Sequence, residues 1–418
     1  MAIIVRGLET REAGGYFDCV ARVAIDGRDR EMVLRRYGDH PDLTRRDDTF
    51  DPFAVALLVP AMIRGEPLVI EGGVDEFLLV ALRSLVQETL RLMAPAWKRV
   101  AVEAEPRPAP LATDWSKGAA TAMSGGIDSM HLMRHRFLDP GVPEAMRVRT
   151  PVHHHVGAHG DDDRVFDEQV AHARRVADRL GLPLVGTRCS FTEAYRGMKH
   201  IHSVLPRNVA ASLALDHLFA VFHYGSSEPL GGRPRMTRFD GIATLEPQLL
   251  PLFNTTKAVW MQFGADVSRL QKTADVLAEE WLRGDLLVCI RGFQPDRANL
   301  NCGRCYKCCR VLLHAEADGI LDQVAGTFDL EGARRGRTHA LVRLVHRSLG
   351  PWRNGNETDL LKYLHERRFP FPAWIRPAVA LAIAVHGTRH SLRPEGDGDQ
   401  RPAQSAATRS SAATSASR

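Results

Sequence analysis

The chain has 418 residues, of which 44% are hydrophobic and 25% charged, the balance of an ordinary globular protein. This length suggests two or three domains and a core large enough that neither disulfides nor a metal is needed to hold the whole fold together. The formal net charge of +5 favours anionic ligands slightly, but it does not by itself indicate nucleic-acid binding.

Neither end of the sequence has the pattern of a secreted or membrane protein. The apolar run Ile3–Val5 is too short for the core of a signal peptide. The apolar stretch from Pro377 to Val385 is far shorter than the roughly 20 residues that span a bilayer. We therefore expect a cytoplasmic protein without a membrane partner, in which the seven cysteines are mostly reduced.

The first part of the chain, residues 1–103, is predicted to be a small α+β domain. Alternating residues at 16–25 predict a strand, and apolar residues at helical spacing predict a helix over 75–94. Residues 104–112 contain three prolines and few large apolar side chains, which is typical of a linker. We identify no catalytic signature in this domain.

From residue 113 to 325, strand-like and helix-like segments alternate. Such alternation predicts an α/β domain with a doubly wound parallel sheet. The expected strands are 119–123, 148–157, 184–187 and 285–290, and the expected helices begin near 129 and cover 164–180 and 207–219. Helical patterns continue in an extension over 326–387, and the Ser-, Ala- and Arg-rich residues 388–418 predict a disordered tail.

A glycine-rich turn, Ser124-Gly-Gly-Ile-Asp-Ser129, lies between the first strand and helix of this alternating region. Gly125 and Gly126 let a phosphate approach the backbone, and the serine hydroxyls can donate further hydrogen bonds. Asp128 would repel a phosphate unless a cation lies between them, and a magnesium ion resolves that conflict. The structural alternative is a glycine turn followed by a helix cap.

A cysteine cluster follows the last predicted strand. Cys302, Cys305 and Cys308 have two-residue spacers, and Cys289 upstream makes a fourth thiolate, enough for a tetrahedral zinc site. An iron–sulfur cluster has the same ligand type, and a catalytic thiol is a third reading. Cys309 is additional.

Weaker signals lie elsewhere in the region. His153, His154 and His155, with His159 and the aspartates at 161–163, suggest a metal site, but a solvated loop after the second strand is the favoured interpretation. Lys257 and Lys272 could reach a leaving pyrophosphate, although surface positions are expected for both.

The turn resembles the SGGxDS signature of the PP-loop ATP pyrophosphatases, which have the HUP, or adenine-nucleotide α-hydrolase-like, fold. The cysteine motif, which includes Gly303, is most similar to that of 7-cyano-7-deazaguanine synthase-like proteins. The resemblance covers roughly residues 119–315. Two departures are a longer gap between Cys289 and Cys302 and the extra Cys309.

The resemblance implies cleavage of ATP between the α and β phosphates. It assigns catalytic roles to Asp128 and Ser129, and the Arg207-Asn208 pair is similar to an Arg-Asn of the family. The implied ATP-binding residues are Ser124, Gly125, Gly126, Ile127, Asp128, Ser129, Arg207 and Asn208.

The leading functional hypothesis is therefore an ATP-dependent ligase that adenylates a carboxylate or carbonyl oxygen, releases pyrophosphate and joins the product to ammonia or an amine. The alternatives are an ATP-dependent sulfur transferase that uses a cysteine or an iron–sulfur cluster, and a non-catalytic ATP-binding module. The expected cofactors are ATP, magnesium and zinc. The expected partner is a small-molecule or peptide-derived substrate, with no nucleic-acid motif in the chain; a homodimer is the candidate assembly.

Overall fold

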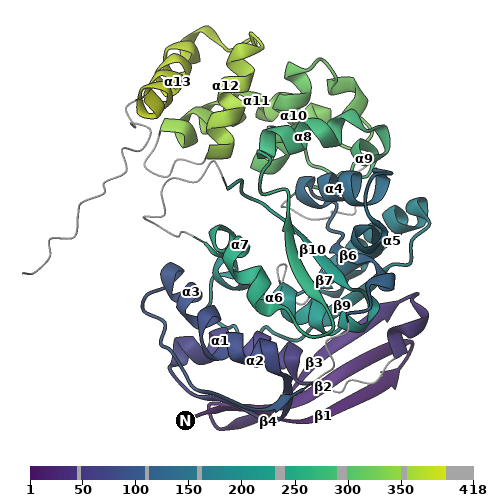
Figure 1. Cartoon of the computed structure of the whole chain (residues 1–418). Helices are drawn as coiled ribbons and strands as arrows, with labels where there is room; N and C mark the ends of the chain where they lie inside the picture. Colours follow the sequence, from purple (N-terminus) through teal and green to yellow (C-terminus); the bar gives the residue numbers. More distant parts are fainter. Residues whose placement is uncertain are drawn as a thin grey trace, which may run out of the picture.

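The computed structural model describes residues 1–44, 49–108, 113–157, 162–230, 241–289, 299–349 and 355–391. The protein is α/β, and its described strands form one mixed ten-stranded sheet in the order β11-β10-β6-β7-β9-β3-β2-β1-β4-β5 (Figure 1). The strands are β1 (Ile3–Ala13), β2 (Tyr16–Ile25), β3 (Arg28–Gly38), β4 (Leu68–Asp75), β5 (Val102–Arg107), β6 (Ala119–Ala122), β7 (Val148–His155), β9 (Val185–Cys189), β10 (Val221–Gly225) and β11 (Val259–Phe263).

Helices pack in two main core clusters. The first cluster joins strand residues to α1 (Asp51–Arg64), α2 (Glu76–Arg83), α3 (Leu85–Met93), α6 (His200–Leu213) and α7 (Glu246–Leu249). The second contains α4 (Ile127–Met133), α5 (Asp163–Leu180), α8 (Arg269–Ala278), α9 (Glu280–Gly284) and α10 (Tyr306–Ala317), together with the cysteine cluster. The phosphate-loop candidate and the cysteines therefore share one core.

The strands β6, β7, β9, β10 and β11 are mutually parallel where they pair. The chain starts at β6, adds β7 and β9 on one side, and then adds β10 and β11 on the other side. In open α/β sheets, ligands bind beyond the carboxyl ends of the strands where the order reverses in this way. The loop after β6 lies at this position.

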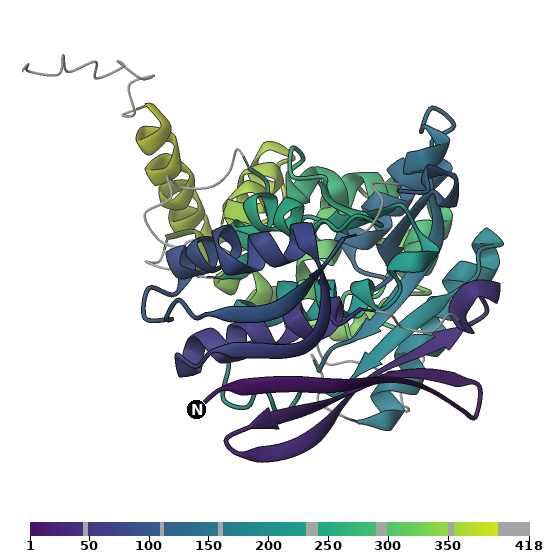
Figure 2. The same ribbon diagram turned by 60° about the horizontal axis from the view of Figure 1, so that its bottom comes forward.

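The amino-terminal strands continue the same sheet. The strand β3 pairs with β9 in antiparallel register from Leu34 opposite Cys189 to Gly38 opposite Val185. The α/β class is therefore confirmed, and the strands of residues 113–325 are parallel where they pair, but the sheet as a whole is mixed because the amino-terminal strands join it. Figure 2 shows these long purple strands below the amino-terminal helices.

Part of the predicted linker is a strand. Residues 104–107 belong to β5, which among the described strands pairs with β4 alone, at the edge of the sheet. Proline cannot donate to a sheet ladder, but an edge strand tolerates it, and Pro106 lies there. Residues 109–112 lie outside the described residues.

Several local predictions are confirmed and others are wrong. The helix predicted over 164–180 is α5, and Asp162 caps it by accepting from the N–H groups of Arg164 and Val165. Residues 285–289 are not a strand, because the side chain of Asn301 binds their backbone in place of a neighbouring strand. The five-residue strands β10 and β11 were not predicted.

The carboxy-terminal extension is helical as predicted. Its helices α11 (Leu330–Leu349), α12 (Gly355–Glu366) and α13 (Arg376–Ser391) pack in a third cluster, far from β1 in Figure 1. The helix α13 includes the first four residues of the predicted tail, and 392–418 lie outside the described residues. Within the described chain, no helix has both the length and the apolar character required to cross a membrane.

Candidate functional site

The glycine turn connects β6 to α4, and its backbone requires glycine at one position. Gly125 has φ of +72°, and a Cβ there would lie 2.6 Å from Nε2 of His172. The carbonyl of Gly125 accepts from the N–H of Leu287 at 2.8 Å, which ties the turn to the segment that precedes the cysteine cluster. Gly126 has φ of −79° and more space around it.

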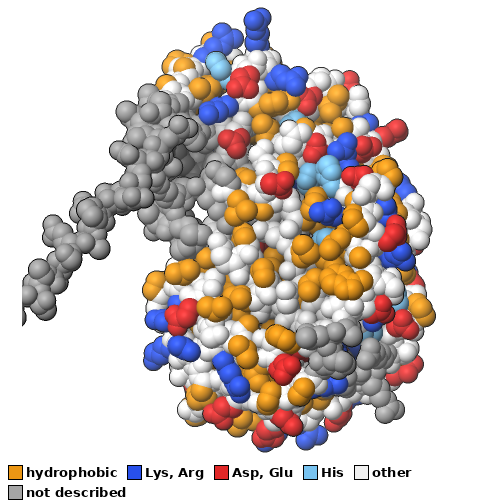
Figure 3. All heavy atoms as spheres, in the orientation of Figure 1, with side chains coloured by type: hydrophobic (Ala, Val, Ile, Leu, Met, Phe, Trp, Pro, Cys, Tyr) orange, Lys and Arg blue, Asp and Glu red, His pale blue; other side chains and the backbone are white. Residues whose placement is uncertain are grey.

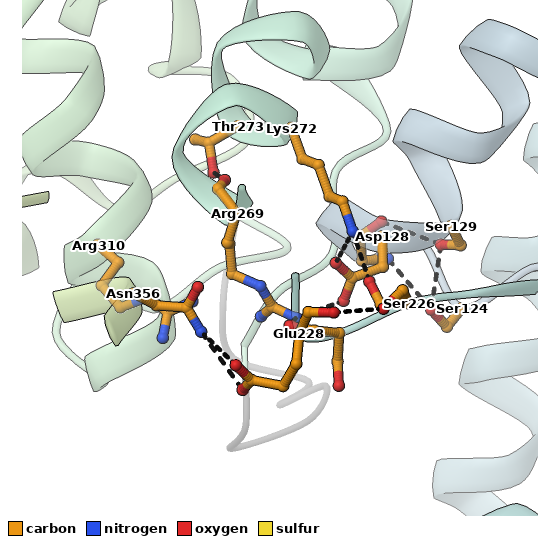
Figure 4. A network of polar contacts seen from close by, with 12 residues as sticks. Ser124, Asp128, Ser129, Ser226, Glu228, Arg269, Lys272, Thr273, Arg310 and Asn356 are labelled. Atoms are coloured by element: carbon orange, nitrogen blue, oxygen red, sulfur yellow. Dashed lines mark hydrogen bonds and ion pairs between the residues drawn. The ribbon is translucent and has the colours of Figure 1, made fainter. Parts of the chain in front are cut away.

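The two serines of the turn face each other. Their hydroxyl oxygens are 3.1 Å apart, and Ser129 Oγ donates to the carbonyl of Gly126 at 3.0 Å. Ser124 Oγ accepts from the N–H of Gly126 at 3.3 Å. Both hydroxyls therefore lie together at the turn (Figure 4), and their hydrogen bonding to a phosphate stays a prediction.

Asp128 lies in a network of cations that the sequence did not predict. Its Oδ2 accepts from Arg269 at 2.5 Å, and its Oδ1 lies 3.9 Å from Nζ of Lys272 (Figure 4). Oδ1 is buried and accepts no hydrogen bond from any described residue. Oδ1 is therefore the oxygen of this carboxylate that could bind a magnesium ion.

The expectation of a surface position is wrong for Lys272. This side chain is 1% exposed, and Nζ donates to the carbonyl of Ser226 at 2.6 Å in the loop after β10. Arg269 donates to the next carbonyl, that of Ser227, at 3.1 Å. Helix α8 thus presents two cations to both the turn and the loop after β10. The ammonium group of Lys257 instead lies 3.8 Å from the carboxylate oxygen Oδ2 of Asp216.

Burial makes the charge of this network costly. It lowers the pKa of Lys272 and of Arg310 on α10, in both cases with a further contribution from the nearby Arg269. The side chain of Lys307, also on α10, is exposed, and partial desolvation of its ammonium group together with Arg269 lowers its pKa. Cations that lose water in this way gain when an anion approaches them. The site therefore has unbalanced positive potential close to Asp128.

The Arg207-Asn208 pair lies on α6, beside neighbouring strand ends. Arg207 donates to the carbonyl of Val156 at 3.2 Å, and its guanidinium carbon lies 4.0 Å from the ring centroid of Tyr195. Asn208 donates to the hydroxyl of Tyr224, at the end of β10, at 3.4 Å. No contact described for the pair joins it directly to Asp128.

The histidines of the second strand pack within the sheet. His153, His154 and His155 belong to β7 rather than to a loop, and His153 Nδ1 lies 2.6 Å from the hydroxyl of Tyr37. His154 points to the other face and stacks on Phe222. His159 and Asp161 lie outside the described residues, whereas Asp162 and Asp163 start α5.

The four predicted cysteines are brought together and are buried. The sulfur of Cys308 lies 3.3 Å from that of Cys305 and 4.0 Å from that of Cys302, and all four sulfurs, with that of Cys289, lie within 4.8 Å of one another. A tetrahedral zinc ion with Zn–S bonds of about 2.3 Å separates its sulfurs by about 3.8 Å. The cluster can therefore hold a metal such as zinc.

Two further residues build this cluster. Gly303 has φ of +67°, and a Cβ there would lie 2.0 Å from the carbonyl oxygen of Asp329, so the turn between Cys302 and Cys305 requires glycine. Asn301 is fully buried and binds the backbone on both sides: its Oδ1 accepts from Val288 at 2.8 Å and from Cys289 at 3.1 Å. Its Nδ2 donates to the carbonyls of Leu286 and Thr327.

Cys309 lies outside the cluster. Its thiol contacts the carbonyl of Gly303 at 3.5 Å, and burial raises the pKa of this thiol to about 11. A thiol with this pKa is protonated near neutral pH and is a poor nucleophile.

A cavity of about 350 Å³ opens between α10, α11 and α12, beside Cys309. Glu357 is the one acidic residue among its lining residues and lies between Arg310, at 3.4 Å, and Arg347, at 3.7 Å. The other basic lining residues are Arg304, His339 and Arg343. The cavity is thus strongly basic, and Arg310 links it to the cations around Asp128.

Sequence reasoning missed Arg269, Asn301 and the basic cavity. The regular spacing of His339, Arg343 and Arg347 along one helical face was a usable signal for the cavity. No local pattern distinguishes Arg269 or Asn301. On the face in Figure 3, charges of both signs interleave with apolar side chains, in line with the small net charge.

The chain matches no known protein-family description, and neither curated proteins nor solved structures give a match.

Proposed function

We propose that the protein is an ATP-dependent ligase-type enzyme that binds Mg-ATP at the 124–129 turn and adenylates a carboxylate or carbonyl oxygen of its substrate. The observation that carries this proposal is the pairing of Asp128, inside a glycine turn, with the half-buried Arg269 and the buried Lys272. A lone carboxylate beside a turn would repel phosphate, whereas this set has net positive charge. Its position where the strand order reverses also favours a nucleotide.

The proposed reaction has two steps. A substrate oxygen attacks the α-phosphorus of ATP, and the bond from that phosphorus to the oxygen bridging the α and β phosphates breaks, so that pyrophosphate leaves with the electron pair. Arg269, Lys272 and Lys307 stabilise the charge that develops on the leaving group. Ammonia or an amine then attacks the acyl carbon, AMP departs and a proton is released to solvent.

The turn itself supplies positioning. Ser124 and Ser129 offer hydroxyls, and the backbone at Gly126 has space beside it for a phosphate, whereas the space beside Gly125 is filled by His172. A magnesium ion, with Oδ1 of Asp128 as one ligand, would neutralise phosphate charge when bound.

We assign the cysteine cluster a structural zinc rather than a role in sulfur transfer. Four buried thiols converge as a closed set of ligands, which is the pattern of a structural site. The fifth cysteine, Cys309, has a raised pKa, which disfavours a catalytic thiol. The hydrogen bond from Leu287 to Gly125 connects the segment before the cluster to the turn, so that the cluster can stabilise the turn.

The basic cavity is the proposed place for an acidic part of the substrate. Its four arginines outnumber its single carboxylate, so an anionic group would improve the local charge balance. Substitution of Arg343 by Ala should raise KM for the acid substrate and leave ATP binding unchanged.

The test uses the full chain, unlabelled ATP, labelled pyrophosphate and a panel of carboxylic acids. We expect acid-dependent exchange of labelled pyrophosphate into ATP, with AMP as the nucleotide product. Asp128→Asn should reduce exchange by at least about 100-fold, an effect typical of losing one preorganised electrostatic group. Asp266→Asn is the control, because Asp266 is an exposed carboxylate just before α8, the helix that carries Arg269 and Lys272.

The outcomes separate the hypotheses. Release of ADP and phosphate would refute the proposal, and exchange that survives Asp128→Asn would remove the role given to this carboxylate. ATP binding without exchange for any acid would favour the non-catalytic module. Iron with acid-labile sulfide in anaerobically purified protein would favour sulfur transfer.

A further inference from the structure

A second group of metal-ligand side chains lies outside the cysteine cluster, between helices α4 and α8. It consists of His131 on α4, His135 in the π-helical turn Arg134–Leu138 that follows, and Asp275 on α8. One ligand atom from each residue lies within 4.8 Å of the other two. The proposed function uses none of these three residues.

The distances fit a tetrahedral metal ion. Nδ1 of His131 lies 3.2 Å from Oδ2 of Asp275, and Nε2 of His135 lies 3.6 Å from the same oxygen. An ion with bonds of about 2.0 to 2.1 Å to nitrogen and oxygen separates its ligand atoms by about 3.3 to 3.4 Å. The observed separations lie on either side of this value.

The ligand atoms are also left without other partners. Nδ1 of His131 and Nε2 of His135 are buried and make no hydrogen bond within the described part of the chain, in spite of the nearby carboxylate. Buried polar atoms of this kind are normally satisfied. The other oxygen of Asp275 accepts from Gln271 at 2.9 Å, which fixes the carboxylate with Oδ2 toward the imidazoles.

The local backbone favours this convergence. The two histidines are four residues apart, a spacing that places both on one helical face, and a π-helical turn is frequent at functional sites. Their ring centroids are 4.5 Å apart. The side chain of His135 is 35% exposed and lies on the solvent side of the group, whereas His131 is 2% exposed.

Neighbouring cations are mostly engaged elsewhere. Arg134 binds Glu279 at 3.1 Å, and Arg136 lies over the ring of Phe263 at 4.6 Å. Lys272 is close enough to affect His131, but its ammonium group donates to the backbone of Ser226.

We propose that His131, His135 and Asp275 form a binding site for a divalent transition metal such as zinc, which clamps α4 to α8. Two imidazoles and one carboxylate leave a fourth position for water or another ligand. The turn at 124–129 leads into α4, and Arg269 is the first residue of α8, so the ion would hold the two elements of the phosphate-loop network together. The proposal does not depend on the catalytic activity of that network.

The test is the metal stoichiometry of the full chain. Protein stripped with a chelator and titrated with Zn²⁺ should bind two equivalents, one at the cysteines and one at this site. Substitution of both His131 and His135 by Ala should leave one equivalent, and His135→Asn alone should weaken the second equivalent by at least about tenfold. With Co²⁺, the thiolate charge-transfer band of the cysteine site should be unchanged in these variants.

His314→Ala is the matched control, because His314 is also buried and lies 3.2 Å from a single carboxylate, that of Asp318. This variant should retain both equivalents. Binding of one equivalent by the wild-type chain, or of two by a folded double-alanine variant, would overturn the proposal. If the double variant does not fold, the test rests on the single variant His135→Asn, whose substituted side chain is half-exposed. Unchanged affinity of this variant for the second equivalent of Zn²⁺ would refute the site.

Discussion

Asn301→Ala is expected to destabilise the protein and to loosen the cysteine cluster. The wild-type side chain makes four hydrogen bonds, to the N–H groups of Val288 and Cys289 and to the carbonyls of Leu286 and Thr327, at 2.7 to 3.2 Å. Because residues 285–289 lie outside the sheet, these bonds replace the ladder that a strand would have. Alanine leaves these buried backbone groups to find other partners.

The magnitude follows from those four bonds. A typical buried hydrogen bond contributes about 1 kcal/mol net, and a buried group left unsatisfied costs about 1 to 3 kcal/mol. With partial relaxation, the free energy of unfolding should fall by about 3 to 5 kcal/mol. Cys289 is one of the four ligands, so metal should also leave the variant faster.

The assay is urea unfolding with zinc present, together with the rate of zinc transfer to a chromogenic chelator. Asn254→Ala is the control, because the half-buried Asn254 accepts one hydrogen bond, from the N–H of Trp260, at 2.8 Å. The control should lose about 1 kcal/mol and release zinc at the wild-type rate. A loss below about 1 kcal/mol for Asn301→Ala, or equal zinc release from both variants, would refute the reasoning.

Three further predictions follow from the same structure. Gly125→Ala should cost about 1 to 3 kcal/mol through strain at positive φ and weaken ATP binding in calorimetry, whereas Gly126→Ala, in an ordinary conformation, should cost less; equal losses would contradict this. Burial raises the pKa of Asp51 to about 7, so the native state binds more protons than the unfolded state and stability should fall as pH rises from about 4 to 7. Asp51→Asn should flatten that slope in pH-dependent melting curves, and an unchanged slope would exclude Asp51 as its source. Metal analysis should find zinc lost from Cys308→Ser but retained in Cys309→Ser, because only Cys308 belongs to the converging set; loss from both would redefine the ligands.

The sequence by itself determined the features that depend on neighbours along the chain. The spacing of Cys302, Cys305 and Cys308 and the glycines of the 124–129 turn act through local backbone geometry, and the structure gathers their side chains as expected. The helix α5 is likewise set by its own apolar periodicity and its Asp162 cap.

Tertiary structure decided what lies opposite those features. Arg269 is 141 positions from Asp128, and only the packing of α8 on α4 brings the two side chains to 2.5 Å. The pairing of β3 with β9, which makes the sheet mixed, joins segments about 150 residues apart through backbone groups that carry no residue-specific signal. In the same way, the His131 and His135 spacing is visible in the sequence, whereas the carboxylate of Asp275 that completes the group is supplied by the fold.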